Sequence, residues 1–380
     1  MSAHSASVLR RLALGTSVTA ITALALSGCS GGSTADASDG TMTVTFANYN
    51  ESVPFFQVIH TTLDGLDPAS KGVDVTWFDN KGDASTMLQN VQQMIVEQPN
   101  AMVLYPVSSA TDGVSKLIAD SGIPCVALNI DASACSFLNI DNAALGDESA
   151  TIVGEIAKQR GWDASNTTVL IGQNAAAGEG VNAAVHHFYS TVADVLGFEA
   201  VAPDAISATT TTIGTNGIQF DGGSTLQPSF EAVQGLIASI PADRNIILYT
   251  VNNDSTNGAL RALEDAGRGG ADKLLIAGLG GDETGLASLK NDPRWVAEGD
   301  IFVSYWGEYA VAMAQALADG VKPPADVTPL PQLVMNKEQL ATYHPDGTTA
   351  VAKLPPLNED NRFLGDTGFL KAMGNVEGVE

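Results

Sequence analysis

The stretch from Val73 to Asp131 decides the fold and reads VDVTWFDNKGDASTMLQNVQQMIVEQPNAMVLYPVSSATDGVSKLIADSGIPCVALNID. It holds three apolar runs that are rich in Val, Leu and aromatic residues and too short for helices: Val73–Phe78, Ala101–Tyr105 and Cys125–Leu128. Between these runs, apolar residues recur at helical spacing, namely Met87, Val91, Met94 and Ile95, then Val114, Leu117 and Ile118. Strands that alternate with helices of this length form βαβ units. The stretch therefore predicts an α/β fold with a doubly wound parallel sheet.

Parallel sheets of this kind bind ligands in the crevice beyond the carboxyl ends of their strands. The loops that follow Phe78, Tyr105 and Leu128 are therefore the first places to look for a site. Both faces of such a sheet are covered by helices, so its strands are apolar on both sides.

Length and charge limit the possible functions. A chain of 380 residues is longer than one ordinary domain, so we expect two lobes. With 44% hydrophobic residues it can build a large core. The formal net charge of −25 argues against nucleic acid as a partner, because phosphate backbones are bound by Lys and Arg.

The first residues have the features of an export signal. Arg10 and Arg11 precede an apolar run, Leu12–Leu26, which is followed by small residues. This pattern predicts a signal peptide over residues 1–28, and a short membrane anchor is the alternative. Leu26-Ser27-Gly28-Cys29 resembles a bacterial lipobox, which implies lipidation of Cys29 and a membrane-attached, exported protein. Residues 29–40 are Ser, Gly, Ala, Thr and Asp after Cys29, as in a flexible tether.

Two further cysteines, Cys125 and Cys135, lie ten positions apart in the part of the chain expected to be exported. A hairpin-like return between neighbouring strands would bring them together in a disulfide, which an oxidising compartment favours. Two buried free thiols are the alternative. No histidine pairs with either in the sequence, so neither is expected to be a catalytic nucleophile.

The rest of the chain continues the alternation of strands and helices. Met42–Ala47 is a predicted strand, and the loop after it carries Phe55 and Phe56 in place of a dinucleotide-binding glycine motif. These adjacent aromatics cannot face one direction on a helix, so one of them is expected to point toward the crevice. Further strands are predicted at Phe137–Ile140, Thr168–Ile171, Glu199–Ala202, Ile246–Thr250, Leu274–Ala277 and Ile301–Ser304. Ser207–Ser224 is predicted as an irregular loop, and residues 346–380 as a polar tail.

Several local patterns follow one another along the chain: Pro54-Phe55-Phe56, Asp79-Asn80…Asp83, Gln89…Gln92-Gln93, Tyr105-Pro106-Val107, Gly122-Ile123-Pro124, Asn253-Asp254…Gly258-Ala259, Gly278…Gly281-Asp282 and Leu333-Val334-Met335-Asn336-Lys337-Glu338. In this order they resemble the type 1 periplasmic-binding-protein family, in particular the ribose- and galactose-like sugar-binding lipoproteins of ABC importers. The resemblance covers roughly Thr43 to Tyr343.

This resemblance implies two similar doubly wound lobes joined by a three-strand hinge, with sugar held between them. The first lobe would span residues 41–142 plus about 305–328, and the second would span residues 143–304 plus about 329–345. The resemblance also implies the ligand-binding residues, which are Phe55, Phe56, Asn129, Asn182, Asn253, Asp282, Tyr305 and Trp306. Asn182 stands where ribose-type members have an arginine, and Tyr305 where a glutamine is common, so the sugar is left open.

These residue types suit a sugar or polyol. Aromatic rings stack on the C–H faces of a sugar, while carboxylates and amides pair with its hydroxyls. Asp282 would accept two hydroxyl protons, and an Asn side chain donates and accepts at once.

Rival chemistries find weaker support. Gly278, Gly280 and Gly281 lack the spacing of a dinucleotide-binding motif, and no G-x-S-x-G motif lies between a predicted strand and a predicted helix. Adjacent His186 and His187 point about 100° apart on a helix and do not form a metal-ligand pair. The sequence therefore predicts neither a metal nor a cofactor, and no enzyme.

The leading hypothesis is a monomeric substrate-binding lipoprotein that captures a sugar or polyol and delivers it to an ABC import permease. It would be attached by lipid to the outer face of the bacterial cytoplasmic membrane, or lie in the periplasm. Two alternatives remain: a receptor that signals to a membrane kinase, and an exported carbohydrate-active enzyme such as a glycosidase.

Overall fold

The computed structural model describes residues 40–380, and residues 41–380 form one unit. The predicted signal peptide, the lipidation site Cys29 and nearly all of the tether lie outside the described residues. Within residues 40–380, no helix has the length and apolar character needed to cross a membrane.

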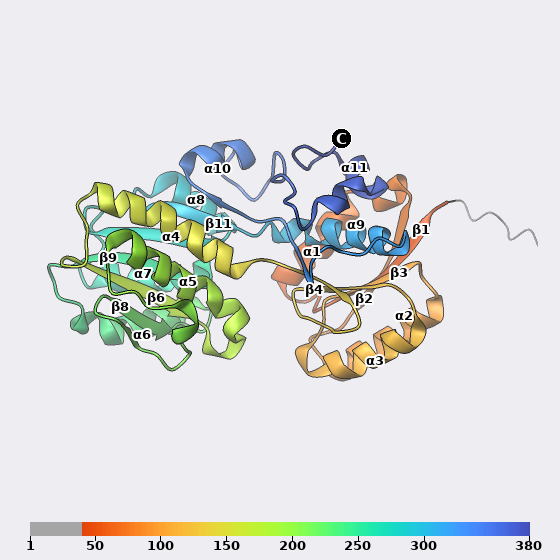
Figure 1. Ribbon diagram of the computed structural model, residues 1–380, viewed down its shortest axis with the longest axis horizontal. Helices are drawn as coiled ribbons and strands as arrows, with labels where there is room; N and C mark the ends of the chain where they lie inside the picture. Colours follow the sequence, from red (N-terminus) through yellow and green to blue (C-terminus); the bar gives the residue numbers. More distant parts are fainter. Residues whose placement is uncertain (1–39) are drawn as a thin grey trace, which may run out of the picture. The chain divides into compact units, whose positions relative to one another are not determined.

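The first half of the fold is a six-stranded sheet whose neighbouring strands are all parallel, in the order β12-β5-β4-β3-β1-β2 (Figure 1). Its strands are β1 (Met42–Asn48), β2 (Val73–Asp79), β3 (Ala101–Leu104), β4 (Cys125–Leu128), β5 (Ser136–Asn139) and β12 (Val327–Pro329). Its helices are α1 (Pro54–Gly65), α2 (Ala84–Glu97), α3 (Thr111–Ser121) and α9 (Trp306–Ala318).

Successive residues of these strands enter different cores, because side chains alternate between the two faces of a sheet. Phe46 and Val103 pack in the cluster that includes Tyr309 of α9. Ala47 and Met102 pack in a second cluster, formed with Met87, Val91 and Met94 of α2 and Val114 and Ile118 of α3. Helices therefore cover both faces, which confirms the α/β class predicted from Val73–Asp131.

The second half is a seven-stranded sheet in the order β13-β11-β10-β9-β6-β8-β7, in which only the β7–β8 and β11–β13 pairs are antiparallel. Its strands are β6 (Thr167–Gln173), β7 (Thr212–Ile213), β8 (Gly217–Asp221), β9 (Asn245–Thr250), β10 (Leu274–Gly280), β11 (Trp295–Asp300) and β13 (Leu333–Met335). Its helices are α4 (Asn142–Gln159), α5 (Glu179–Leu196), α6 (Leu226–Leu236), α7 (Asn253–Asp265), α8 (Glu283–Asn291) and α10 (Lys337–Tyr343).

Two strand predictions and one loop prediction in this half are wrong. Residues 199–202 form no strand and lead into a 3₁₀ helix, Pro203–Ala205, while the expected loop Ser207–Ser224 contains β7 and β8. Ile301–Ser304 is not a strand because β11 ends at Asp300. The Asp300 side chain accepts a hydrogen bond from the Phe302 backbone at 2.7 Å, and Phe302 has a left-handed φ of 44°. This local bond turns the chain and competes with strand pairing.

The order of strands shows how the chain passes between the halves. Strands β1 to β5 lie in the first sheet and β6 to β11 in the second, after which β12 returns to the first and β13 to the second. The segment after α10 is folded: it contains a 3₁₀ helix, Arg362–Asp366, and α11 (Gly368–Met373), both of which contact α9.

Cys125 of β4 and Cys135, in the loop before β5, form a disulfide with their Cα atoms 4.6 Å apart. The bond closes the β4–β5 loop, which begins with Asn129.

Candidate functional site

A cavity of about 730 Å³ lies at the carboxyl ends of strands from both sheets. From the first half it is lined by residues that follow β3, β4 and β5, and from the second by residues that end or follow β9, β10 and β11. The main side chains are Phe55, Tyr105, Asn129, Asn142, Asn252, Asp254, Leu279, Asp282, Asp300, Phe302, Tyr305, Trp306, His344, Thr349 and Val351. Strands β3, β4 and β5 run parallel to one another in the first sheet, and β9, β10 and β11 do so in the second, so their carboxyl ends lie at one edge of each sheet.

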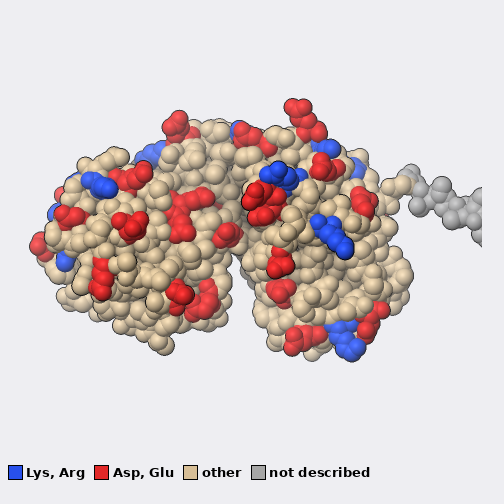
Figure 2. Space-filling model, in the orientation of Figure 1, with Lys and Arg blue, Asp and Glu red and all other residues tan. Residues whose placement is uncertain are grey.

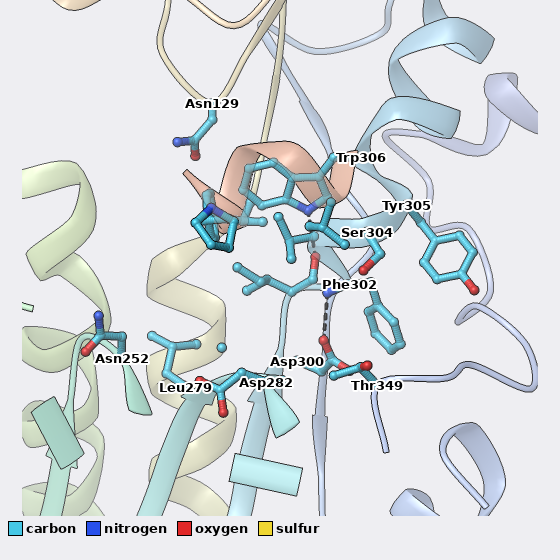
Figure 3. A pocket seen from close by; sticks show the side chains of 18 of the residues that line it. Asn129, Asn252, Leu279, Asp282, Asp300, Phe302, Ser304, Tyr305, Trp306 and Thr349 are labelled. Atoms are coloured by element: carbon cyan, nitrogen blue, oxygen red, sulfur yellow. Dashed lines mark hydrogen bonds between the residues drawn. The ribbon is translucent and has the colours of Figure 1, made fainter. Parts of the chain in front are cut away.

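Aromatic side chains form one wall of the cavity (Figure 3). The rings of Phe55 and Trp306 are 6.0 Å apart and perpendicular, and Tyr105 lies 6.4 Å from Trp306. Trp306 is held by a 2.7 Å hydrogen bond from its indole nitrogen to the Ile301 carbonyl, whereas Phe55 is 41% exposed. An exposed ring beside a fixed one offers an apolar surface to a ligand.

The two adjacent phenylalanines have different surroundings. Phe55 lines the cavity, while Phe56 packs behind it between Tyr49, at 4.6 Å, and Tyr105, at 5.0 Å. Helix α1 begins at Pro54, so consecutive side chains point about 100° apart. Phe56 is not among the cavity-lining residues, so the structure brings only Phe55 of this pair to the site.

Asn129 and Asp282 supply polar groups from opposite halves (Figure 3). Asn129 has a left-handed φ of 62° and donates from its side-chain nitrogen to the Tyr105 hydroxyl at 2.6 Å. One Asp282 oxygen caps α8 by accepting 2.8 Å hydrogen bonds from the Gly285 backbone and the Thr284 hydroxyl. Its other oxygen has no hydrogen-bond partner among residues 40–380 and is available to a ligand.

Asn253 and Asn182 do not line the cavity. Asn253 is fully buried; it donates to Glu298 at 2.7 Å and accepts from the Leu279 backbone at 3.0 Å. Asn182 is also fully buried and exchanges two hydrogen bonds with the backbone of Asn174, at 2.8 and 2.9 Å. Both amides are occupied by protein groups. Asn252, the N-cap of α7, lines the cavity one position before Asn253.

Glu298 is buried below the loop that carries Asp282. It accepts hydrogen bonds from Asn253, from the Gly281 backbone at 2.9 Å and from the Trp295 indole at 3.0 Å. Burial raises the pKa of Glu298 to about 8, against the effect of the bonds from Asn253 and Gly281. Gly281 itself has a left-handed φ of 68°, and a Cβ there would collide with Asp300, so glycine is required. This network positions Asp282 at the cavity edge.

Asp300 and His344 form a buried pair at the cavity, which the sequence analysis missed. The Nε2 atom of His344 lies 2.7 Å from Asp300, and its Nδ1 atom faces the carbonyls of Thr348 at 2.9 Å and Ala350 at 3.2 Å. Both ring nitrogens face oxygen acceptors, as a protonated imidazole requires. Burial lowers the pKa of His344, but the hydrogen bond and charge of Asp300 outweigh burial and raise it. The predicted strand Ile301–Ser304 put the end of the strand at Ser304, so Asp300 was not identified as a strand-end residue.

The charged side chains that line the cavity are Asp254, Asp282, Asp300 and His344, with no Lys or Arg. The surface has the same excess of acidic side chains, since Figure 2 shows more acidic than basic side chains on the visible face. Within residues 40–380, no three His, Cys, Asp or Glu side chains cluster as a metal site would require.

Fold and site together define a ligand-binding protein of the α/β class with its cavity between two sheets. A family model described as the periplasmic binding protein domain matches residues 44–322, which is more than half of the chain. The chain belongs to this family, whose members are extracytoplasmic binding proteins. A comparison with curated proteins gave no match.

Solved structures share the fold at low sequence identity. A periplasmic ribose ABC transporter protein from Conexibacter woesei is 16% identical, with a TM-score of 0.63 over 82% of this chain and 98% of its own. A solute-binding protein from Actinobacillus succinogenes with bound D-allose is 16% identical, with a TM-score of 0.61 over 80% and 100%. One from Bacillus halodurans with bound myo-inositol is 16% identical, with a TM-score of 0.60 over 81% and 99%. These similarities confirm the fold implied by the resemblance.

Proposed function

We propose that the chain is a solute-binding protein of an ABC importer that captures an uncharged sugar or polyol in the cavity described above. The observation that carries the proposal is the composition of the cavity lining. It combines the exposed aromatic ring of Phe55, from the first half, with the Asp282 carboxylate, from the second half, which has one free oxygen. The free oxygen of Asp282 and the side-chain oxygen of Asn129 suit hydroxyl groups, while the exposed ring of Phe55 suits the C–H face of a sugar ring.

The charge of the cavity supports an uncharged ligand. Phosphate and carboxylate groups are recognised mainly by Arg and Lys, and the lining contains neither. Three lining carboxylates would instead repel an anion. Sugar phosphates and uronic acids are therefore expected to bind more weakly than the matching neutral sugars.

The remaining parts of the proposal concern delivery. Residues 1–28 would direct export, Cys29 would carry the lipid, and the loaded protein would dock on a permease in the membrane. The protein would act as a monomer and without catalysis. The lipobox-like Leu26-Ser27-Gly28-Cys29 and the membership of a family of binding proteins support this role.

Thermal unfolding of the full chain tests the proposal. The panel consists of myo-inositol, D-allose, D-arabinose and glycerol, which occupy related structures, with ribose 5-phosphate and glucuronate as anionic controls. At about 100 times its dissociation constant, a ligand adds about 2.7 kcal/mol to the free energy of unfolding. We expect a neutral member to raise the melting temperature and the anions to leave it unchanged. A folded protein that responds to no neutral sugar or polyol would contradict the proposal.

A further inference from the structure

We propose that the C-terminal segment, residues 344–380, is part of the ligand site. Thr349 and Val351 would form a wall that limits the size of the ligand. This inference rests on the function proposed above and extends it to a segment beyond residues 44–322, where the family model matches.

The beginning of the segment is attached to the second half. His344, directly after α10, pairs with Asp300 at the end of β11. Two residues later, the Asp346 carbonyl accepts a hydrogen bond from Lys290 of α8 at 2.9 Å. The His344 ring also lies parallel to that of Phe302, with centroids 5.7 Å apart. These contacts fix the segment where it enters the cavity region.

The end of the segment is attached to the first half. The Phe369 backbone donates to Gln315 of α9 at 2.9 Å, and Asn375 donates to the buried Glu308 of the same helix at 2.8 Å. Phe369 and Leu370 are buried in the core cluster that contains α9. The segment therefore connects the two halves once more. The chain has already passed from one half to the other before β6, before β12 and before β13.

Between these attachments, the segment lines the cavity. Thr349 and Val351 are cavity-lining residues, and Figure 3 shows Thr349 at the cavity edge that Asp300 also lines. The His344 ring contacts the carbonyls of Thr348 and Ala350, on either side of Thr349. A hydrogen bond of 2.8 Å from the Ala352 backbone to the Tyr343 carbonyl closes the loop. The backbone that presents both side chains is thus held on each side.

A wall held in this way determines how much room a ligand has. Larger side chains at its lining positions reduce the space, and the surrounding structure yields only in part because protein interiors are close-packed. The wall should therefore affect ring-sized ligands more than a three-carbon polyol.

The test compares Val351→Trp with Ala352→Trp in the full chain. Ala352 is the matched control because it is adjacent and exposed and does not line the cavity. The probes are myo-inositol, D-allose, D-arabinose and glycerol, measured by calorimetry. Relative to the wild type, we expect Val351→Trp to weaken the ring-sized probe that binds by about tenfold or more, and glycerol less. Ala352→Trp should stay within about twofold.

The outcomes separate this inference from the proposed function. If the folded wild type binds none of the probes, the proposed function fails and this inference fails with it. If the wild type binds but Val351→Trp binds equally well, only the wall is refuted. Should Val351→Trp not unfold cooperatively, Val351→Ala and Thr349→Val replace it. A change in the affinity ratio of ring-sized probe to glycerol in either supports the wall, and unchanged ratios in both overturn it.

Discussion

Asp282 caps α8 with one carboxylate oxygen and offers the other to the cavity. Asp282→Asn should keep the cap, because Asn is an equally good N-cap, but should lose the charged acceptor. We expect ligand affinity to fall by about 1–3 kcal/mol, or roughly fivefold to 150-fold, with the melting temperature nearly unchanged. Calorimetric titration with the ligand found in the panel measures this.

The chain offers a matched control for that substitution. Asp83 caps α2 with the same pair of bonds, from the Thr86 backbone and hydroxyl at 2.8 Å each, and lies outside the cavity. Asp83→Asn should leave affinity unchanged. Equal losses in both variants, or none in either, would show that the Asp282 carboxylate does not contact the ligand.

Asn253 should matter for stability rather than for direct contact with ligand. Asn253→Ala leaves the Glu298 carboxylate and the Leu279 backbone without their buried partner. An unpaired buried polar group costs about 1–3 kcal/mol, so the urea midpoint should fall by a corresponding amount. Asn257→Ala, at a partly exposed position of the same helix, is the control. If Asn253→Ala keeps the stability of the wild type but loses ligand binding, Asn253 contacts the ligand directly.

At the scale of elements, the Asp300–His344 pair joins the end of β11 to the segment after α10. The pKa of His344 is raised in the folded protein above the ordinary value of 6.5. The folded state thus binds the proton more tightly than the unfolded chain. The stabilisation is complete below about pH 6.5 and is lost as the pH rises through the folded pKa.

We therefore expect His344→Gln to lower the free energy of unfolding more at pH 6 than at pH 9. Urea unfolding of the wild type and the variant at both pH values measures the difference. His187→Gln is the control, because His187 is partly exposed and contacts Asp147 outside the cavity. If His344→Gln lowers the free energy of unfolding by the same amount at both pH values, protonation of His344 does not contribute to stability.

The disulfide Cys125–Cys135 holds the loop between β4 and β5. Reduction should lower the free energy of unfolding by about 2–4 kcal/mol, because the cross-link restricts the unfolded chain. Thermal unfolding with and without a reductant measures the effect. The double variant Cys125→Ala/Cys135→Ala should not respond to the reductant. A wild type that is equally insensitive would contradict a stabilising bond.

At the scale of the whole molecule, the net charge of −25 opposes compaction. Salt screens this repulsion, so the urea midpoint should rise between about 20 mM and about 300 mM NaCl. Affinity for an uncharged ligand should change little over the same range, because its contacts carry no net charge. A strong salt dependence of binding would instead indicate a charged ligand.

The regular parts of the fold were predictable from the sequence. Three short apolar runs and two helical repeats between Val73 and Asp131 were enough for the α/β class, since side-chain periodicity follows directly from backbone geometry. The strand prediction at Ile301–Ser304 failed because a local hydrogen bond to the Asp300 side chain turns the chain at the end of β11. Glu199–Ala202 also forms no strand, and β7 and β8 form instead within the predicted loop Ser207–Ser224.

The candidate site was predictable only in part. Phe55, Asn129, Asp282, Tyr305 and Trp306 line the cavity, whereas Phe56, Asn182 and Asn253 pack against protein groups. Sequence position places a residue near a strand end, but adjacent side chains there point in different directions. Asn252, the extended N-cap of α7, lines the cavity, whereas Asn253, the first residue of the helix, is buried.

The sequence by itself determined the fold class, the acidic character and the aromatic and polar residue types of the site. These follow from composition and short-range periodicity. The tertiary structure alone decided which side chains meet, including the pairing of Asp300 with His344 and the return of residues 344–380 to α9. Such contacts join residues far apart in the chain, and their free energy depends on packing and burial that no local pattern encodes.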